Sequence, residues 1–118
     1  MSTSTVPTLE ALRARRDEII QLAAKFGATE VRIFGSVARG ESDEKSDVDV
    51  LVDMGPDPDG MEYFGRREDL RRALSELLGY SVDIVDSEAL NPTNPSVSHN
   101  LRSFRRMRTR VMRDAVAL

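Results

Sequence analysis

Apolar residues recur at helical spacing in three stretches of the chain, namely residues 8–26, 61–78 and about 100–115. The first stretch begins at Thr8, which is suited to cap a helix, and Gly27 follows it, which favours a helix end. Each stretch therefore predicts a helix with one face turned towards a core.

Three shorter apolar runs, residues 31–34, 48–52 and 81–85, have the length and the Val and Ile content that are typical of strands. A Gly-Ser pair at residues 35–36 turns the chain after the first run, and residues 37–39 predict the start of a short helix. Helices thus precede, separate and follow three strands. This order predicts an α/β (α+β) fold, a small mixed sheet flanked by helices.

Polar or Gly- and Pro-rich segments separate these elements. Residues 40–46 predict a polar loop, and two prolines break the chain at residues 91–95. Residues 54–60 hold two prolines and two glycines. That composition is compatible with a mobile lid and also with an ordinary turn, so both interpretations stay open.

The bulk composition limits the class of protein. The length of 118 residues is that of one domain, 1–118, in which residues 1–7 are expected to be flexible. The chain has no cysteine, which excludes disulfides, zinc–thiolate sites and thiol nucleophiles. It has no apolar run long enough to span a membrane and no signal-peptide pattern at its start, so a cytoplasmic location is expected.

The net charge of −3 conceals two oppositely charged stretches. Residues 40–62 hold nine acids against Lys45, whereas residues 99–118, the predicted Arg-rich final helix, hold six arginines against Asp114. These stretches are either two solvated faces that attract each other, or a cation site and a partner surface. Binding of nucleic acid is not expected, because no interleaved aromatic residues accompany the arginines. The lone His99 is expected at the surface and not in a zinc site.

The candidate chemistry lies between residues 34 and 52. Backbone N–H groups of Gly35 and Ser36, at the start of a helix, are suited to hold a phosphate. Asp47 and Asp49 are two residues apart at the start of a strand, so their side chains point to the same face. Such a pair of carboxylates favours a bound cation.

A third acid, Asp83, lies 34 residues after Asp49 inside another apolar strand. The intervening strand end, loop and helix can return it beside the first pair on a neighbouring strand. By itself Asp83 could equally face solvent, although a carboxylate flanked by Val82 and Ile84 is costly to bury without a partner. Three carboxylates suit Mg²⁺, and two such ions can clamp the attacking and leaving oxygens of a phosphoryl displacement.

The run Gly35-Ser36-Val37-Ala38-Arg39-Gly40, followed by Ser46-Asp47-Val48-Asp49, resembles the signature of the DNA polymerase beta-like nucleotidyltransferase superfamily. The short length is similar to its minimal branch, the MNT proteins. The resemblance covers roughly residues 10–90, and Asp83 stands where the third acid of the signature is expected.

The resemblance implies transfer of a nucleoside monophosphate from an NTP to a hydroxyl, with release of pyrophosphate. Gly35 and Ser36 would hold the β- and γ-phosphates. Asp47 and Asp49 would bind the metal ions, and Asp83 would bind the catalytic metal and help to activate the acceptor. For Arg39, contact with a phosphate or a partner and pairing with an acid of the 41–49 loop are equally open.

Proteins of this size resemble the antitoxins of HEPN–MNT toxin–antitoxin modules, which implies transfer of AMP from ATP to a tyrosine of a cognate HEPN ribonuclease. The expected cofactors are Mg²⁺ and ATP, and the expected partner is the toxin, in a shared oligomer. Two alternatives remain. The chain could neutralise its toxin by binding alone, with an acidic face over a basic groove, or could transfer the nucleotide to a small-molecule hydroxyl.

Overall fold

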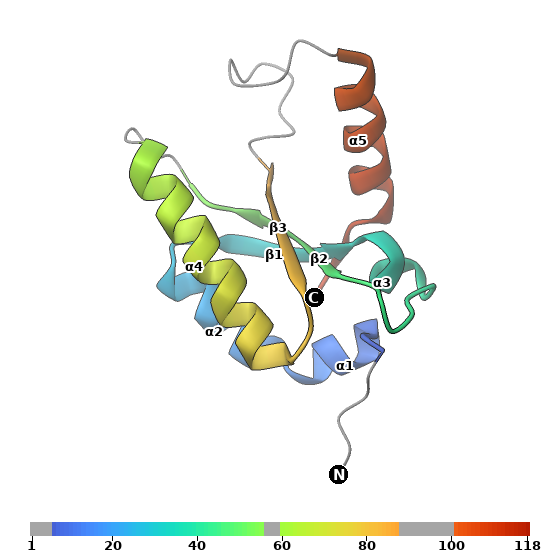
Figure 1. Ribbon diagram of the computed structural model, residues 1–118, viewed down its shortest axis with the longest axis horizontal. Coiled ribbons are helices and arrows are strands. Elements are labelled where there is room, and N and C mark those ends of the chain that lie inside the picture. Colours follow the sequence, from blue (N-terminus) through green and yellow to red (C-terminus); the bar gives the residue numbers. More distant parts are fainter. Residues whose placement is uncertain (1–5, 56–59, 88–100) are drawn as a thin grey trace.

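The computed structural model describes residues 6–55, 60–87 and 101–118. Its elements, in chain order, are α1 (Leu9–Ala14), α2 (Arg16–Lys25), β1 (Thr29–Phe34), α3 (Gly35–Arg39), β2 (Val48–Asp53), α4 (Gly60–Leu78), β3 (Val82–Asp86), α5 (Leu101–Asp114) and β4 (Val116–Ala117). Figure 1 shows the helices arranged around a central twisted sheet. The predicted mixed sheet with flanking helices is confirmed.

The sheet has the strand order β3-β2-β1-β4, in which β2 and β3 are parallel and the other pairs are antiparallel. The three predicted strands are present, with β1 beginning at Thr29 and β3 shifted by one residue to end at Asp86. The fourth strand was not predicted from the sequence. It consists of Val116 and Ala117, which pair with β1 beyond the end of α5.

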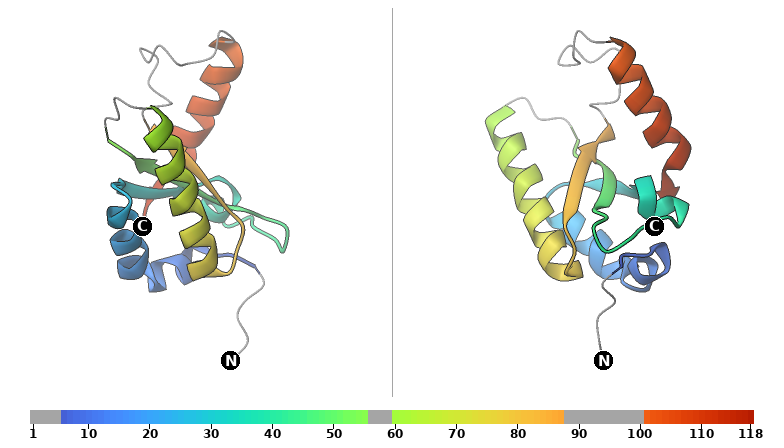
Figure 2. Two further views of the ribbon diagram at one scale, coloured as in Figure 1. Left: turned by 60° about the vertical axis from the view of Figure 1, so that its left-hand side comes forward. Right: turned by 45° about the vertical axis from the view of Figure 1, so that its right-hand side comes forward.

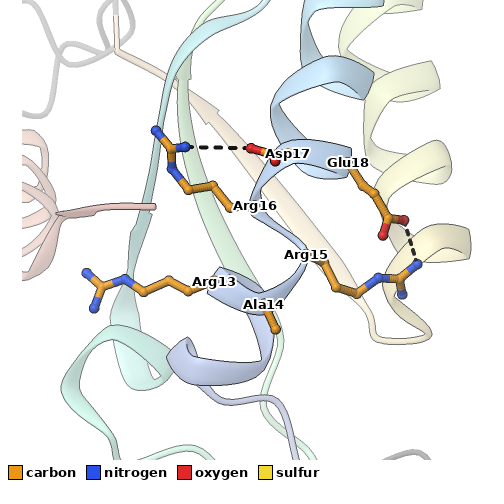
Figure 3. A pocket seen from close by; sticks show the side chains of 6 residues that line it. All are labelled: Arg13, Ala14, Arg15, Arg16, Asp17 and Glu18. Carbon is orange, nitrogen blue, oxygen red and sulfur yellow. Dashed lines mark hydrogen bonds and ion pairs between the residues drawn. The ribbon is translucent and has the colours of Figure 1, made fainter.

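The prediction of one helix over residues 8–26 is wrong. The backbone of Arg15 leaves the helical region, with φ −113° and ψ 22°, and separates α1 from α2. The Arg15 guanidinium donates a hydrogen bond to the carbonyl of Leu77 at the end of α4 and pairs with Glu18. The break allows Leu12 and Ile19, one on each side of it, to enter the same core. Figure 3 shows this junction from close by.

The main core lies on the face of the sheet that α2 and α4 cover. Alternate strand residues such as Val50, Val52 and Ile84 are buried there against Leu70 and Leu74 of α4. Figure 2 shows α2 and α4 together on one side of the sheet and α5 on the other. The helical periodicity of the sequence therefore identified the core face of α4 correctly.

Helix α5 packs on the opposite face through the end nearest to β4. Val111 is buried with Leu51, and Phe34, Val85 and Ala115 pack around them. The preceding residues 106–110 of the helix are exposed, and Figure 1 shows α5 extending beyond the edge of the sheet. The spacing predicts that Leu101, Phe104, Val111 and Ala115 face inward, and this is confirmed for Val111 and for Ala115, which follows the end of α5. Those at residues 101–105 lie outside the side chains that the structure describes.

Burial bears on the extent of the flexible N-terminal segment. Pro7 is buried and its carbonyl accepts a hydrogen bond from Ser42, so the predicted flexible segment 1–7 does not extend to Pro7. Within residues 6–55, 60–87 and 101–118, no helix is both long enough and apolar enough to cross a membrane. His99, the break at 91–95 and most of the 54–60 loop lie outside the described residues.

Candidate active site

The Gly-Ser turn connects β1 directly to α3, without an intervening loop. Gly35 has φ +76°, a left-handed conformation in which a side chain is strained. A Cβ atom at this position would also lie 2.2 Å from the Oδ2 atom of Asp49. Glycine is therefore required at position 35 both by the backbone and by the close approach of the Asp49 carboxylate.

Asp49 and Asp83 are direct partners in the parallel ladder between β2 and β3. Both side chains point away from the main core, because their neighbours Val48, Val50 and Val82 are buried on the other face. Asp83 is exposed and Asp49 is half-buried. Both interpretations that the sequence left open for Asp83 are therefore correct. Its side chain is exposed to solvent, and it lies beside Asp49 on the neighbouring strand.

Burial and the neighbouring acids shift the pKa of Asp49. Burial, then the charge of Asp83 and then that of Asp47 raise the pKa of Asp49 from 3.8 to about 6, while the positive charge of Arg39 opposes the shift. A carboxylate in these surroundings is stabilised by any cation that binds between it and its neighbours.

The loop before Asp47 is ordered by its own side chains. The backbone N–H of Asp43 donates to Ser46 Oγ at 2.8 Å, and the N–H of Lys45 donates to the carboxylate of Asp43 at 2.9 Å. This turn delivers Asp47, which is exposed, to the start of β2.

The three acids do not form a complete metal cage. Among residues 6–55, 60–87 and 101–118, no group of three or more Asp, Glu, His or Cys side chains is arranged to hold a metal ion. Mg²⁺ normally keeps several water or substrate-phosphate ligands and needs only one or two carboxylates. The carboxylates of Asp49 and Asp83, which are ladder partners on adjacent strands, together with Asp47 two residues before Asp49, are a donor set of the kind that suits this ion.

Arg39 lies in the last turn of α3 and is paired with two acids. Its Nε atom is 3.0 Å from Glu41 Oε2, and its Nη1 atom is 2.6 Å from Asp114 Oδ2. Hydrogen bonds to Glu41 and Asp114 raise the pKa of Arg39. Of the alternatives open for Arg39, the structure contains the pairing with an acid of the 41–49 loop.

Sequence reasoning missed Asp114, the second partner of Arg39. Burial disfavours the charge of Asp114, but hydrogen bonds from Arg39 and Arg113 outweigh that effect and lower its pKa. The sequence did contain a signal for it, because Asp114 is the single acid of the Arg-rich stretch 99–118 and stands immediately before an apolar segment.

A concave region lies at the junction of α1 and α2, far from these acids in sequence. It has a volume of about 380 Å³ and is lined by residues 13–18 (Figure 3). Arg15 pairs with Glu18, Arg16 lies 3.7 Å from Asp17, and Arg13 donates to the carbonyl of Ala117. None of the predicted site residues lines this region.

The geometry agrees with comparisons to known proteins. Residues 16–111 of the chain match the model of the family described as "Nucleotidyltransferase domain". The chain therefore belongs to the nucleotidyltransferase domain family, and it is a nucleotidyltransferase.

Several archaeal relatives have more specific names. The chain is 34% identical over 90 residues to "Protein adenylyltransferase MntA" of Thermococcus cleftensis, covering 76% of this chain and 85% of that protein. It is 39% identical over 80 residues to "Putative protein adenylyltransferase MJ0128" of Methanocaldococcus jannaschii, covering 68% of this chain and 76% of that protein.

Solved structures share the fold. "Structure of putative minimal nucleotidyltransferase" has a TM-score of 0.66 and 40% identity, and covers 94% of this chain and 96% of that one. "Crystal structure of the toxin-antitoxin with AMP-PNP" has a TM-score of 0.57 and 24% identity, covering 86% of this chain and 69% of that one. The nucleotidyltransferase family inferred from the Gly-Ser and Asp-x-Asp motifs, and its minimal branch inferred from the short length, are confirmed.

Proposed function

We propose that this nucleotidyltransferase transfers AMP from ATP to a tyrosine hydroxyl of a cognate HEPN ribonuclease toxin, and thereby acts as its antitoxin. The observation that carries the proposal is the Asp49–Asp83 pair beside the turn at Gly35, where a Cβ atom would collide with the Asp49 carboxylate. The printed name of the MntA relative supports protein adenylylation. The toxin–antitoxin complex with AMP-PNP, a structural neighbour, supports the nucleotide and the partner.

Different residues of the chain would bind the nucleotide donor and face the acceptor hydroxyl. The backbone N–H groups at Gly35 and Ser36 would hold the β- and γ-phosphates, because the start of α3 presents free donors. Asp47, Asp49 and Asp83 would hold Mg²⁺, and Asp83, exposed at the edge of the pair, would lie nearest the incoming hydroxyl. When bound, Mg²⁺ supplies positive charge that offsets the charge developing on the phosphate oxygens.

The test is transfer of label from ATP carrying ³²P at the α-phosphate to the protein encoded beside this one, in the presence of Mg²⁺. We expect Asp49→Asn to lower the rate by roughly a thousandfold, because it removes charge from the reacting centre. Glu76→Gln is the matched control, since Glu76 is an exposed acid on α4. Equal labelling by the wild type and Asp49→Asn, or no labelling by either, would contradict the proposal. Replacing each tyrosine of the partner by Phe would identify the acceptor.

A second function, neutralisation by binding alone, is favoured by the surface of α5. Arg106, Arg108 and Arg110 are exposed there together with Met107 and Met112. Such a mixed basic and apolar surface suits contact with another protein. The double variant Asp47→Asn/Asp49→Asn separates the two functions. If this variant still protects cells from the toxin, binding suffices, and if protection is lost while the complex still forms, catalysis is needed.

A further inference from the structure

The carboxylate of Asp114 is almost completely withdrawn from solvent, with 4% of its side chain exposed. A buried carboxylate is stable only when its oxygens are paired. Both oxygens are paired: Oδ2 lies 2.6 Å from Arg39 Nη1, and Oδ1 lies 3.2 Å from Arg113 Nε. Arg113 is a neighbour in sequence, whereas Arg39 comes from a helix 75 residues away.

The backbone that carries Asp114 is fixed on both sides. Before it, Val111 is buried against Leu51 of β2. After it, Val116 pairs with Ile33 of β1, and Leu118 enters the main core. Asp114 is therefore anchored to the same two strands that carry the Gly-Ser turn and Asp49.

Helix α3, by contrast, is too short to hold its own position. It has five residues, far fewer than a helix needs to be stable alone. Val37 is its one buried residue, and Arg39 in its last turn makes the ion pairs that connect it to neighbouring segments. Gly35 follows β1 directly, and Val37 and Ala38 pack on the main core, so the pairs of Arg39 fix the other end of the short helix that begins with Gly35 and Ser36.

Two acids hold Arg39, but they are not equivalent. The side chain of Glu41 is 67% exposed and lies two residues from Arg39, so this pair contributes little to fixing the helix. Asp114 is buried and belongs to a different element, so its partly buried hydrogen bond is less exposed to water than the Glu41 pair and connects α3 to the end of α5.

We propose that Asp114 is a positioning residue for nucleotide binding, which holds Arg39 and, through Arg39, the phosphate-binding turn at Gly35–Ser36. The proposal rests on the function proposed above for this turn. It assigns a role to a residue that lies outside the matched family segment, residues 16–111. Under this proposal Arg39 serves the site through its ion pairs with Glu41 and Asp114 and does not contact the phosphate itself.

The test compares Asp114→Asn with Glu41→Gln, which removes the charge of the other partner of Arg39. Hydrogen–deuterium exchange of the segment 34–40 reports on the helix itself. We expect amide exchange in Asp114→Asn to be roughly tenfold faster than in the wild type. The reason is that losing a hydrogen bond between charged groups makes local opening of the helix easier. In Glu41→Gln it should change less than about threefold.

Nucleotide binding supplies the second readout. We expect the affinity for AMP-PNP with Mg²⁺ to fall by roughly tenfold in Asp114→Asn, with KM for ATP rising in parallel and kcat nearly unchanged. A purely structural role for Asp114 would instead lower the active fraction, and hence kcat, without changing KM. If Asp114→Asn is poorly folded, Arg39→Lys provides the same comparison, because lysine keeps the charge but does not bridge two acids.

The possible results distinguish the positioning role of Asp114 from the proposed function. Unchanged exchange over residues 34–40, or unchanged AMP-PNP affinity in folded Asp114→Asn, would overturn the positioning role. Equal effects of Asp114→Asn and Glu41→Gln would also overturn it. Failure of the wild type to bind AMP-PNP would overturn both proposals. Binding of AMP-PNP without transfer of AMP to the partner would overturn only the proposed acceptor and leave the role of Asp114 intact.

Discussion

The two faces of the central sheet, built from the same strands, differ in character: one carries the main apolar core, and the other carries an acidic pair beside the smaller apolar cluster of Leu51 and Val111. On the face that α2 and α4 cover, Val50 of β2 is paired with Ile84 of β3, and both are buried. On the other face, one residue earlier in each strand, Asp49 is paired with Asp83. Since strand side chains alternate, a single register produces an apolar core and an acidic site. A slip by one residue would bury the acids and expose the core.

The comparison also separates two energetic roles. Burial of each large apolar side chain on the covered face stabilises the fold by about 1.5–3 kcal/mol. The acidic pair on the other face does the reverse, because like charges at adjacent ladder positions repel each other. The fold thus tolerates charge repulsion at the place where a cation is expected to bind. Burial of apolar side chains on the opposite face of the sheet compensates for the lost stability.

The largest expected contrast is between neighbours on β3. Ile84→Ala should lower the free energy of unfolding by about 2–5 kcal/mol because it leaves a cavity, with kcat of the folded protein nearly unchanged. Asp83→Asn should lower the transfer rate by roughly a hundredfold or more and leave stability unchanged or higher. Urea unfolding and labelled-ATP transfer measure the two effects. If Asp83→Asn unfolded as readily as Ile84→Ala, the assignment of stability to the buried face and of activity to the acidic pair would be wrong.

The next contrast is between two glycines at the ends of α3. Gly35 and Gly40 both have positive φ, +76° and +73°, so alanine at either should cost about 1–2 kcal/mol of stability. Only at Gly35 does the new Cβ collide with Asp49, whereas nothing lies within 4 Å at Gly40. Gly35→Ala should therefore lose at least about tenfold more transfer activity than Gly40→Ala. Equal activities in the two variants would show that the approach to Asp49 is unimportant.

The smallest effect is the pH dependence of stability without divalent cations. Because the pKa of Asp49 is about 6 in the folded protein and near 3.8 when unfolded, the folded state binds more protons between these values. Stability should fall as pH rises through this window and stay lower above it. Asp49→Asn should remove that slope and be more stable at pH 7 by about 1–2 kcal/mol, allowing for partial exposure.

Urea unfolding between about pH 4 and pH 7.5 measures this slope. Excess Mg²⁺ should stabilise the wild type above pH 6 and not Asp49→Asn, which is the matched control for non-specific ion effects. Parallel pH profiles for the wild type and the variant would contradict the assignment of the penalty to Asp49.

The sequence predicted the features that depend on local periodicity. Alternating Val and Asp residues identified β2 and its two faces, and the spacing from Asp49 to Asp83 anticipated their meeting on adjacent strands. The buried stripe of α4, which includes Leu70 and Leu74, followed from helical spacing in the same way. The periodicity of β2 and α4 is visible within a few consecutive residues, and the pairing of Asp49 with Asp83 needed only the order of the elements between them.

The features that it did not predict depend on contacts between distant segments. The helical pattern continues through Arg15, and the break there involves a hydrogen bond to Leu77, 62 residues away. Strand β4 is only two residues long, too short to produce a detectable alternation, and exists because β1 offers it a free edge. The pairing of Arg39 with Asp114 likewise joins residues separated by 75 positions.

Within the described residues, β3 forms one outer edge of the sheet, and an unpaired edge is a template for strands of other molecules. Its two acids act against such association. Asp83 places a charge on the open face, and Asp86 is a buried, inward-pointing acid whose Oδ1 accepts from the backbone N–H of Met54 at 3.4 Å. Inward charges of this kind disfavour edge-to-edge aggregation. The carboxylate proposed to serve catalysis therefore also helps to keep the protein from polymerising through its own sheet.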